Sequence, residues 1–167
     1  IRGWWNELSP LQQRLLSGAS TELDRDTFRR ASAPVFDDLL ARTEQEARAG
    51  ARIIVWSECR VAQAGDVLEE DEPALLSRAG DIARATGAYL DLNMCVLLQQ
   101  ARASSFALDQ NVLVEPTGEV AWVYQKAHPV PGEPEFPGDG RVPAIGTPYG
   151  RLSNVICYDL DFLDIVQ

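Results

Sequence analysis

The sequence is poor in the residues that build metal sites and disulfide frameworks. Its 167 residues include three cysteines and a single histidine, His128. An odd number of cysteines without metal-ligand spacing argues against a disulfide framework, and a lone histidine cannot build the usual zinc site. The acidic run of Asp159, Asp161 and Asp164 lacks the glycine and ligand spacing of a calcium loop, and it fits a helix start better. We therefore expect no metal and no other cofactor.

Positive charge and long apolar runs are also scarce. Lysine and arginine number 15 against 25 acidic residues, which leaves a net charge of −10. This excess argues against nucleic acid or an anionic membrane surface as a partner. No apolar run approaches the roughly 20 residues of a membrane-spanning helix, and no signal peptide is visible. Because the chain opens with Ile1 rather than Met, these absences say nothing about segments upstream in a parent protein.

The first half of the chain alternates predicted helices and strands. Residues 26–49 carry apolar side chains on a helical stripe, in which Pro34 should kink or break the helix. The apolar run at 52–56 predicts a short strand buried on both faces. A second helix is predicted over 72–86, because Asp71 precedes it, Pro73 lies just inside its first turn and Gly87 follows it.

The second half predicts strands joined by one long loop. Residues 88–98 form a predicted strand, and the runs at 106–115 and 119–125 form a hairpin across the turn sequence "PTGE". The Pro- and Gly-rich stretch 126–148 is too broken for a helix or central strand, and we expect it to form one wall of a functional site. A last strand is predicted over 152–156. The overall pattern is that of a single α/β domain.

Three residues of suitable chemistry follow three of these strands. Glu58, Lys126 and Cys157 each come directly after an apolar run, and functional groups of open α/β sheets gather at the carboxyl ends of strands. A thiol at a strand-to-helix turn becomes a nucleophile when one group takes its proton and another stabilises the oxyanion. Cys59 and Cys95 have packing contexts, so we expect Cys157 to be the one nucleophilic cysteine.

The same segments carry motifs that resemble those of a known family. The triplet "WSE" ends at Glu58, "YQKAH" contains Lys126, "PGE" ends at Glu133, and "GRLSNVICYDLDFL" ends at Leu163, where the family usually has proline. Together they resemble the carbon–nitrogen hydrolase superfamily, the nitrilase-like amidases and N-acyltransferases. The resemblance runs from about Thr27 to the end of the chain.

The resemblance implies a fold and an extent. The implied fold is α/β, a four-layer αββα sandwich of the nitrilase type, incomplete at both ends in this chain. Residues 1–20 are expected to be a polar and aromatic N-terminal segment, and residues 21–167 a partial carbon–nitrogen hydrolase domain. The family's helical interface makes a homodimer the expected assembly.

The resemblance also implies roles for the site residues. Cys157 would attack an amide carbonyl, Glu58 would take the thiol proton, and Lys126 would hold the oxyanion with the backbone N–H of Tyr158. Glu133 would be a supporting carboxylate that helps to place Lys126 or the attacking group. The reaction would pass through a thioester on the cysteine.

Three functional classes stay open on the sequence. The first is an amidase-type hydrolase acting on a small-molecule amide. The second is an apolipoprotein N-acyltransferase-like enzyme that takes an acyl donor and carries membrane helices upstream. The third is an inactive truncated fragment. Localisation follows the class, cytoplasmic for an amidase and membrane-tethered for an acyltransferase, and is otherwise unknown.

Overall fold

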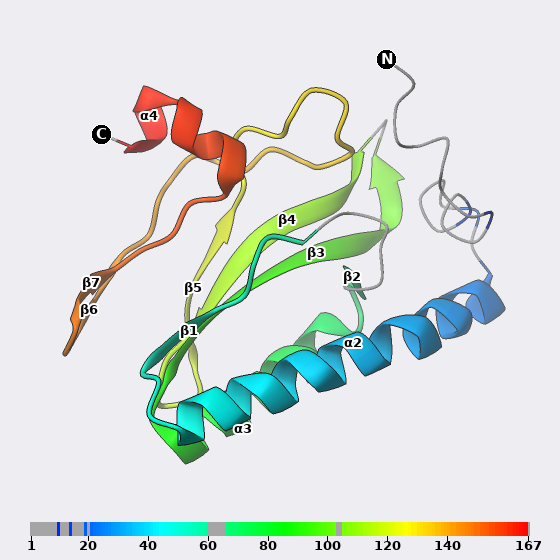
Figure 1. Cartoon of the computed structure of the whole chain (residues 1–167). Coiled ribbons are helices and arrows are strands. Elements are labelled where there is room, and N and C mark those ends of the chain that lie inside the picture. The colour runs from blue at the N-terminus through cyan, green and yellow to red at the C-terminus, as the bar shows by residue number, and fades with distance from the viewer. Residues whose placement is uncertain are drawn as a thin grey trace.

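The fold is a mixed α/β arrangement in which two helices cover one face of a five-stranded sheet (Figure 1). The structure, a computed structural model, describes residues 10, 14, 19, 21–59, 66–102 and 105–166. The expected N-terminal segment 1–20 therefore lies outside the described residues, except at positions 10, 14 and 19. The α/β fold class expected from the sequence is confirmed.

The first described helix, α2, spans Glu22–Arg48. It begins at a capping box in which the side chains of Thr21 and Asp24 each accept a hydrogen bond from the other residue's backbone N–H. Of the kink or break predicted at Pro34, the break is wrong, since the helix continues through that residue. The reason is packing: the proline removes one backbone hydrogen bond, but a stripe of buried side chains runs along the helix on both sides of it, and its apolar members after Pro34 pack into the core with the sheet. The apolar members of this stripe are Phe28, Phe36, Leu40 and Ala47.

The second helix, α3, spans Glu72–Thr86, the range expected from the sequence. Its local signals are strong enough to fix both ends, with Pro73 in the first turn and Gly87 in the left-handed conformation (φ 71°) just past the last turn. Leu75, Ala79 and Ala83 are buried against the sheet.

The main sheet has the strand order β1-β3-β4-β5, and β2 also pairs with β3. Strands β1 and β2 run parallel to β3, while β3, β4 and β5 are antiparallel, as the predicted hairpin requires. The strands are β1 (Ile53–Val55), β2 (Asp66–Leu68), β3 (Tyr89–Arg102), β4 (Ser105–Val114) and β5 (Val120–Gln125). The prediction that the first of these is buried on both faces is wrong. Strand β1 has no neighbour other than β3 along the described sheet, and Val55 is 57% exposed.

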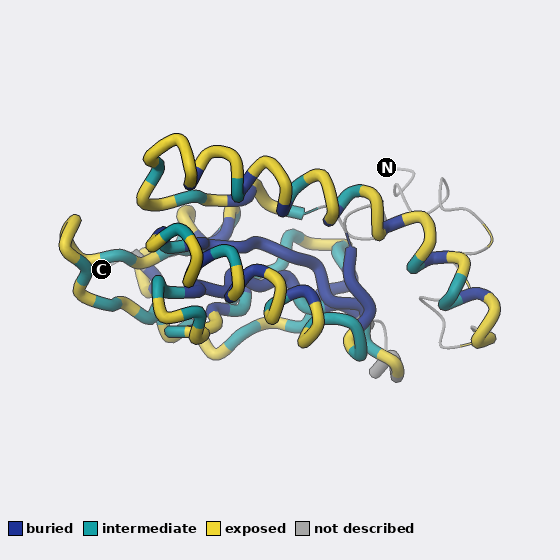
Figure 2. Tube along the Cα trace, turned by 90° about the horizontal axis from the view of Figure 1, so that it is seen from below, coloured by how far each residue is buried: buried dark blue, intermediate teal, exposed yellow. Residues whose placement is uncertain are grey.

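The two faces of the sheet differ in chemistry because side chains alternate along a strand. Leu90, Leu92, Met94 and Val96 pack into the core beneath α2 and α3. The intervening residues of β3 face the other way and are also buried; they are the polar Asp91 and Asn93, and Cys95. Figure 2 shows these strands as the buried centre of the molecule, with the exposed sides of the helices turned outward.

The polar face is covered by the C-terminal part of the chain. Strands β6 (Ile145–Thr147) and β7 (Gly150–Leu152) form a hairpin, followed by the 3-10 helix η2 (Cys157–Asp161) and the short helix α4 (Leu163–Val166). The prediction of a strand over 152–156 is wrong, because β7 ends at Leu152 and residues 153–156 are not part of a strand.

Side-chain contacts hold this stretch in place of a ladder. Asn154 donates from Nδ2 to Asp91 at 2.7 Å, and Ile156 packs with Leu113 and Trp122. No helix among the described residues is long and apolar enough to cross a membrane.

Candidate active site

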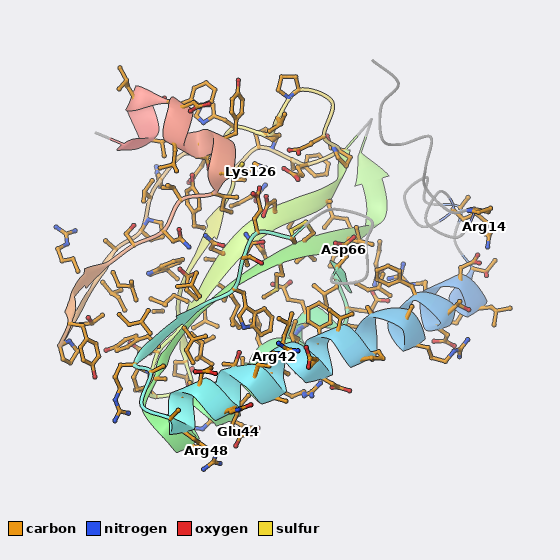
Figure 3. The ribbon with its side chains drawn as sticks, viewed as in Figure 1. Arg14, Arg42, Glu44, Arg48, Asp66 and Lys126 are labelled. Carbon is orange, nitrogen blue, oxygen red and sulfur yellow. A yellow bond between two sulfur atoms is a disulfide. The ribbon has the colours of Figure 1, made fainter. Side chains whose placement is uncertain are left out.

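The site is built around Lys126, the residue that follows β5. Its backbone N–H donates to the carbonyl of Asp109 at 2.9 Å, which continues the β4–β5 pairing by one residue. The side chain is 1% exposed, so its ammonium group lies inside the protein. Figure 3 places Lys126 at the end of the sheet beneath the C-terminal helical turns, away from α2.

Four carboxylates surround this one ammonium group. The Nζ atom lies 3.0 Å from Glu58 Oε1 and 3.2 Å from Glu133 Oε2, and it donates a hydrogen bond to each. Asp109 Oδ2 lies at 3.2 Å and Glu135 Oε2 at 3.4 Å. An ammonium has three N–H donors, so it cannot satisfy four carboxylates at once. These residues come from the end of β1, from β4 and from the loop after β5.

The close approach of four carboxylates to one buried ammonium group shifts pKa values within this cluster. Burial alone would lower the pKa of Lys126, but the charges of Asp109 and Glu135 outweigh it and raise that pKa, so the lysine stays protonated. Burial raises the pKa of Asp109 to about 6 despite the opposing charge of Lys126. Burial and the charge of Asp109 together raise the pKa of Glu135 to about 7. Part of the cluster therefore holds a proton near neutral pH.

The loop after Lys126 is folded back onto the sheet. The N–H of Gly138 donates to the carbonyl of Lys126 at 2.8 Å, and that of Phe136 donates to the carbonyl of Ala107 at 2.9 Å. A Cβ atom on Gly138 would lie 2.2 Å from the carbonyl oxygen of Gln125, so only glycine allows this approach. The closed loop brings both of its glutamates to the lysine, which is how it forms part of the site.

The thiol of Cys157 stands at the start of η2 and is exposed. Its backbone has φ 42°, an uncommon left-handed conformation for a residue with a side chain. Burial of the sulfur, then a hydrogen bond with Glu58 and that residue's charge, raise the pKa of the thiol. The charge of Lys126 and the backbone N–H of Tyr158 act in the opposite direction. The sulfur is thus within the influence of the same groups that surround the lysine.

Asp159 is a site residue that sequence reasoning assigned only to a helix start. It is fully buried, and its carboxylate accepts from the backbone N–H groups of Ala127 at 3.2 Å and His128 at 2.8 Å. It also accepts from the hydroxyl of Tyr124 at 2.6 Å. Asp159 lies two residues after Cys157, and its partners flank Lys126. One carboxylate therefore joins the cysteine turn to the lysine loop.

We expect the substitution Tyr124→Phe to loosen this junction. It removes a hydrogen bond to a buried carboxylate, an interaction of about 1.5–3 kcal/mol. Asp159 keeps its two backbone donors and its contact with His128 Nδ1 at 3.2 Å. Thermal or urea unfolding should show a loss of this size, and kcat should fall because the spacing of Cys157 and Lys126 is less well fixed. The matched control is Tyr149→Phe, since Tyr149 is 56% exposed. Equal stability of the two variants would contradict the role given to Asp159.

The prediction that the cysteines form no disulfide is wrong. Cys59 and Cys95 are joined, 36 residues apart in sequence, and Cys157 is the free cysteine. The pairing arises because Glu58 and Cys59 extend past the end of β1 alongside β3, where Cys95 faces the same side of the sheet. The two sulfurs and the carboxylate of Asp109 lie within 4.8 Å of one another. With the sulfurs bonded to each other, Asp109 is the remaining possible metal ligand of this group.

The structure brings most of the residues expected from the sequence into one place. Glu58, Lys126 and Glu133 are in direct contact, and Cys157 lies beside Glu58. The backbone N–H of Tyr158 acts to lower the pKa of the Cys157 thiol. Sequence reasoning missed the two buried carboxylates and the junction residue of the site, namely Asp109, Glu135 and Asp159. The polar alternation of β4, where Asp109 and Asn111 precede Val112, was the available signal for the first of these.

Comparison with known proteins identifies the family. The carbon-nitrogen hydrolase family model matches residues 25–166. A formamidase from Allorhizobium ampelinum is 33% identical over 75 residues, which are 44% of this chain and 22% of that protein. A formamidase from Pseudomonas syringae pv. syringae is 34% identical over the same length, with the same shares of the two chains.

Solved structures give the same fold. One is the nitrilase-superfamily amidase from Nesterenkonia AN1, in a mutant that has alanine in place of a cysteine. It matches this chain with a TM-score of 0.60 at 23% identity, and the match covers 78% of this chain and 53% of that one. The cysteine-to-alanine mutant of the same amidase in complex with butyramide gives a TM-score of 0.59 at 24% identity, and the match covers 82% of this chain and 53% of that one. The chain thus spans about half the length of these amidases. On the family match and the shared fold, the chain belongs to the carbon-nitrogen hydrolase family.

Proposed function

We propose that this chain carries the catalytic centre of an amidase that hydrolyses a non-peptide amide through a thioester on Cys157. The observation that carries the proposal is the contact set of Glu58. Its carboxylate accepts a hydrogen bond from Lys126 at 3.0 Å, and its hydrogen bonding and charge raise the pKa of the Cys157 thiol. A nucleophile, a base and a cation therefore meet at one carboxylate.

Each step follows from that placement. Glu58 takes the proton of the Cys157 thiol as the sulfur attacks the amide carbonyl carbon, and the carbonyl oxygen becomes an oxyanion. When the carbon–nitrogen bond breaks, Glu58 returns the proton to the leaving ammonia or amine, and a thioester remains. Glu58 then takes a proton from water, which attacks the thioester carbon. The carboxylic acid leaves and the thiol is restored.

Lys126 suits the role of oxyanion donor. Its charge is permanent at neutral pH because the carboxylates around it raise its pKa. Its side chain is held in place by hydrogen bonds to Glu58 and Glu133, so little reorganisation is needed as the oxyanion forms. The backbone N–H of Tyr158, which acts to lower the pKa of the Cys157 thiol, is the second candidate donor.

The relatives favour a small amide as substrate. The formamidases are the curated proteins that match this chain at 33–34% identity. An acyltransferase would share the thioester and differ in the group that resolves it.

The test is the fate of the acyl group in the full-length protein. Formamide, acetamide and butyramide are each incubated with the protein, and ammonia and carboxylic acid are quantified with and without added hydroxylamine. Equal release of ammonia and acid without hydroxylamine, together with hydroxamate formation in its presence, is expected for an amidase with an acyl-enzyme. Ammonia release without acid until an amine is added would instead indicate an acyltransferase. No ammonia from any of the amides would contradict the proposal.

A further inference from the structure

The disulfide lies next to the residue to which the proposed chemistry assigns proton transfer. Cys59 directly follows Glu58, and its partner Cys95 is a fully buried residue of β3. Glu58 itself is 34% exposed at its side chain and lies beyond the last residue of β1, Val55. The strand ladder therefore ends before it reaches Glu58, and other contacts must fix the residue.

Two contacts fix this segment at residue 59. The backbone N–H of Cys59 donates to Asn93 Oδ1 at 2.6 Å, and the side chain is bonded to Cys95. Asn93 in turn donates to Asp109 Oδ1 at 3.0 Å and to Asn111 Oδ1 at 2.8 Å, so its position is set by a buried network. Of the two contacts made by Cys59, the disulfide is the covalent one, and it bonds the segment that carries Glu58 to strand β3 of the sheet.

The disulfide also touches the lysine cluster. Cys59 Sγ lies 3.7 Å from Asp109 Oδ1, and Asp109 Oδ2 lies 3.2 Å from Lys126 Nζ. A disulfide sulfur has no proton to donate, whereas the thiol of a reduced cysteine does. Reduction would thus give Asp109 a new donor while it releases the segment that carries Glu58.

We propose that the Cys59–Cys95 disulfide positions Glu58, so that the activity of the site depends on the redox state of this pair. The inference rests on the proposed function for its effect on turnover. Cys59 and Cys95 act through Glu58 and do not touch the substrate. The oxidised pair ties the segment that carries the base to the sheet by a covalent bond. The reduced pair leaves this segment held by two hydrogen bonds, from the backbone N–H of Cys59 to Asn93 and from Lys126 to Glu58 itself.

The redox step requires a dithiol as reductant. One thiolate of the dithiol attacks Cys59 Sγ, the half-buried sulfur, and the sulfur–sulfur bond breaks with Cys95 leaving as a thiolate that takes a proton. The second thiol of the reagent then attacks the mixed disulfide and releases the Cys59 thiol. Two electrons and two protons pass to the protein, and the dithiol becomes a cyclic disulfide.

The experiment compares the full-length protein before and after dithiothreitol, with free thiols labelled under denaturing conditions and located by peptide mass spectrometry. Cys59 and Cys95 are expected to be unlabelled before treatment and labelled after it, while Cys157 is labelled in both states. Reduction should lower kcat about tenfold, because a misplacement of about 1 Å costs up to 10²-fold, and should change KM much less. The control is the double variant Cys59→Ala/Cys95→Ala, which should have the low kcat in both conditions and no response to dithiothreitol.

A second readout needs no turnover. Glu58 raises the pKa of the Cys157 thiol, so releasing Glu58 should shift the pH profile of Cys157 alkylation by iodoacetamide toward lower pH. This shift is expected even if no amide is a substrate, in which case the proposed function fails and the positioning role stands. An unchanged kcat and an unchanged alkylation profile after Cys59 and Cys95 have become free thiols would overturn the inference. Free thiols at Cys59 and Cys95 in the untreated protein would also overturn it.

Discussion

The substitution Cys157→Ala should abolish amide turnover in the full-length protein. The alanine has no group that can form the thioester, so the expected loss of kcat is on the order of 10⁴-fold or more. Glu58→Gln should come close to the same loss. A glutamine can still accept the hydrogen bond from Lys126, but it cannot take the proton of the thiol. Steady-state kinetics with the best small amide measure both losses.

The matched control is Glu44→Gln, on the exposed face of α2, where the carboxylate pairs with Arg48 one turn away. That variant should keep the activity of the wild-type protein. Both site variants should unfold at the wild-type temperature within a few degrees, because neither side chain is a core residue. An active Cys157→Ala variant would remove the nucleophile from the mechanism.

The substitution Lys126→Met should damage both activity and stability. It removes the proposed oxyanion donor, with an expected loss in kcat on the order of 10²-fold or more. It also leaves four carboxylates without their cation, two of them nearly inaccessible: Asp109 and Glu135. Breaking a buried ion pair from one side costs about 3–5 kcal/mol in the free energy of unfolding.

The stability loss should grow with pH. Burial already raises the pKa of Asp109 to about 6 and that of Glu135 to about 7 with the lysine present. A carboxyl group whose folded pKa lies above its unfolded pKa stabilises the fold fully at low pH, and that contribution is lost as the pH rises through the folded value.

Urea unfolding across pH measures the effect. The Lys126→Met variant should be closest to wild type near pH 4 and furthest from it above about pH 7. Arg42→Met is the control, since Arg42 forms an exposed pair with Asp38 that is worth about 1 kcal/mol or less. A pH-independent difference between Lys126→Met and wild type would contradict the account of the carboxylate cluster.

Local signals in the sequence were enough to predict the elements whose ends or turns are marked by their own residues. The helix α3 has its ends marked by Pro73 and Gly87, and the β4–β5 hairpin has its turn marked by "PTGE". The positions of Glu58, Lys126 and Cys157 could be predicted because each follows an apolar run and lies in a family motif. These features depend on a few neighbouring residues.

The features that could not be predicted depend on register between distant segments. Cys95 meets Cys59 because β1 pairs with β3 from Ile53 opposite Tyr89, a register that no short pattern in the sequence specifies. Glu135 reaches Lys126 only when the loop closes through Gly138. The strand predicted before Cys157 failed because Asn154 bonds to Asp91 from outside the ladder.

The central claim is that Cys157 becomes covalently acylated during turnover. Mass spectrometry of peptides from the full-length protein, quenched in acid while it turns over butyramide, tests this directly. The account predicts a butyryl adduct on the peptide containing Cys157 that hydroxylamine removes, and no such adduct in Cys157→Ala. Turnover without an adduct on Cys157, or an adduct on Cys59 or Cys95 instead, would contradict it.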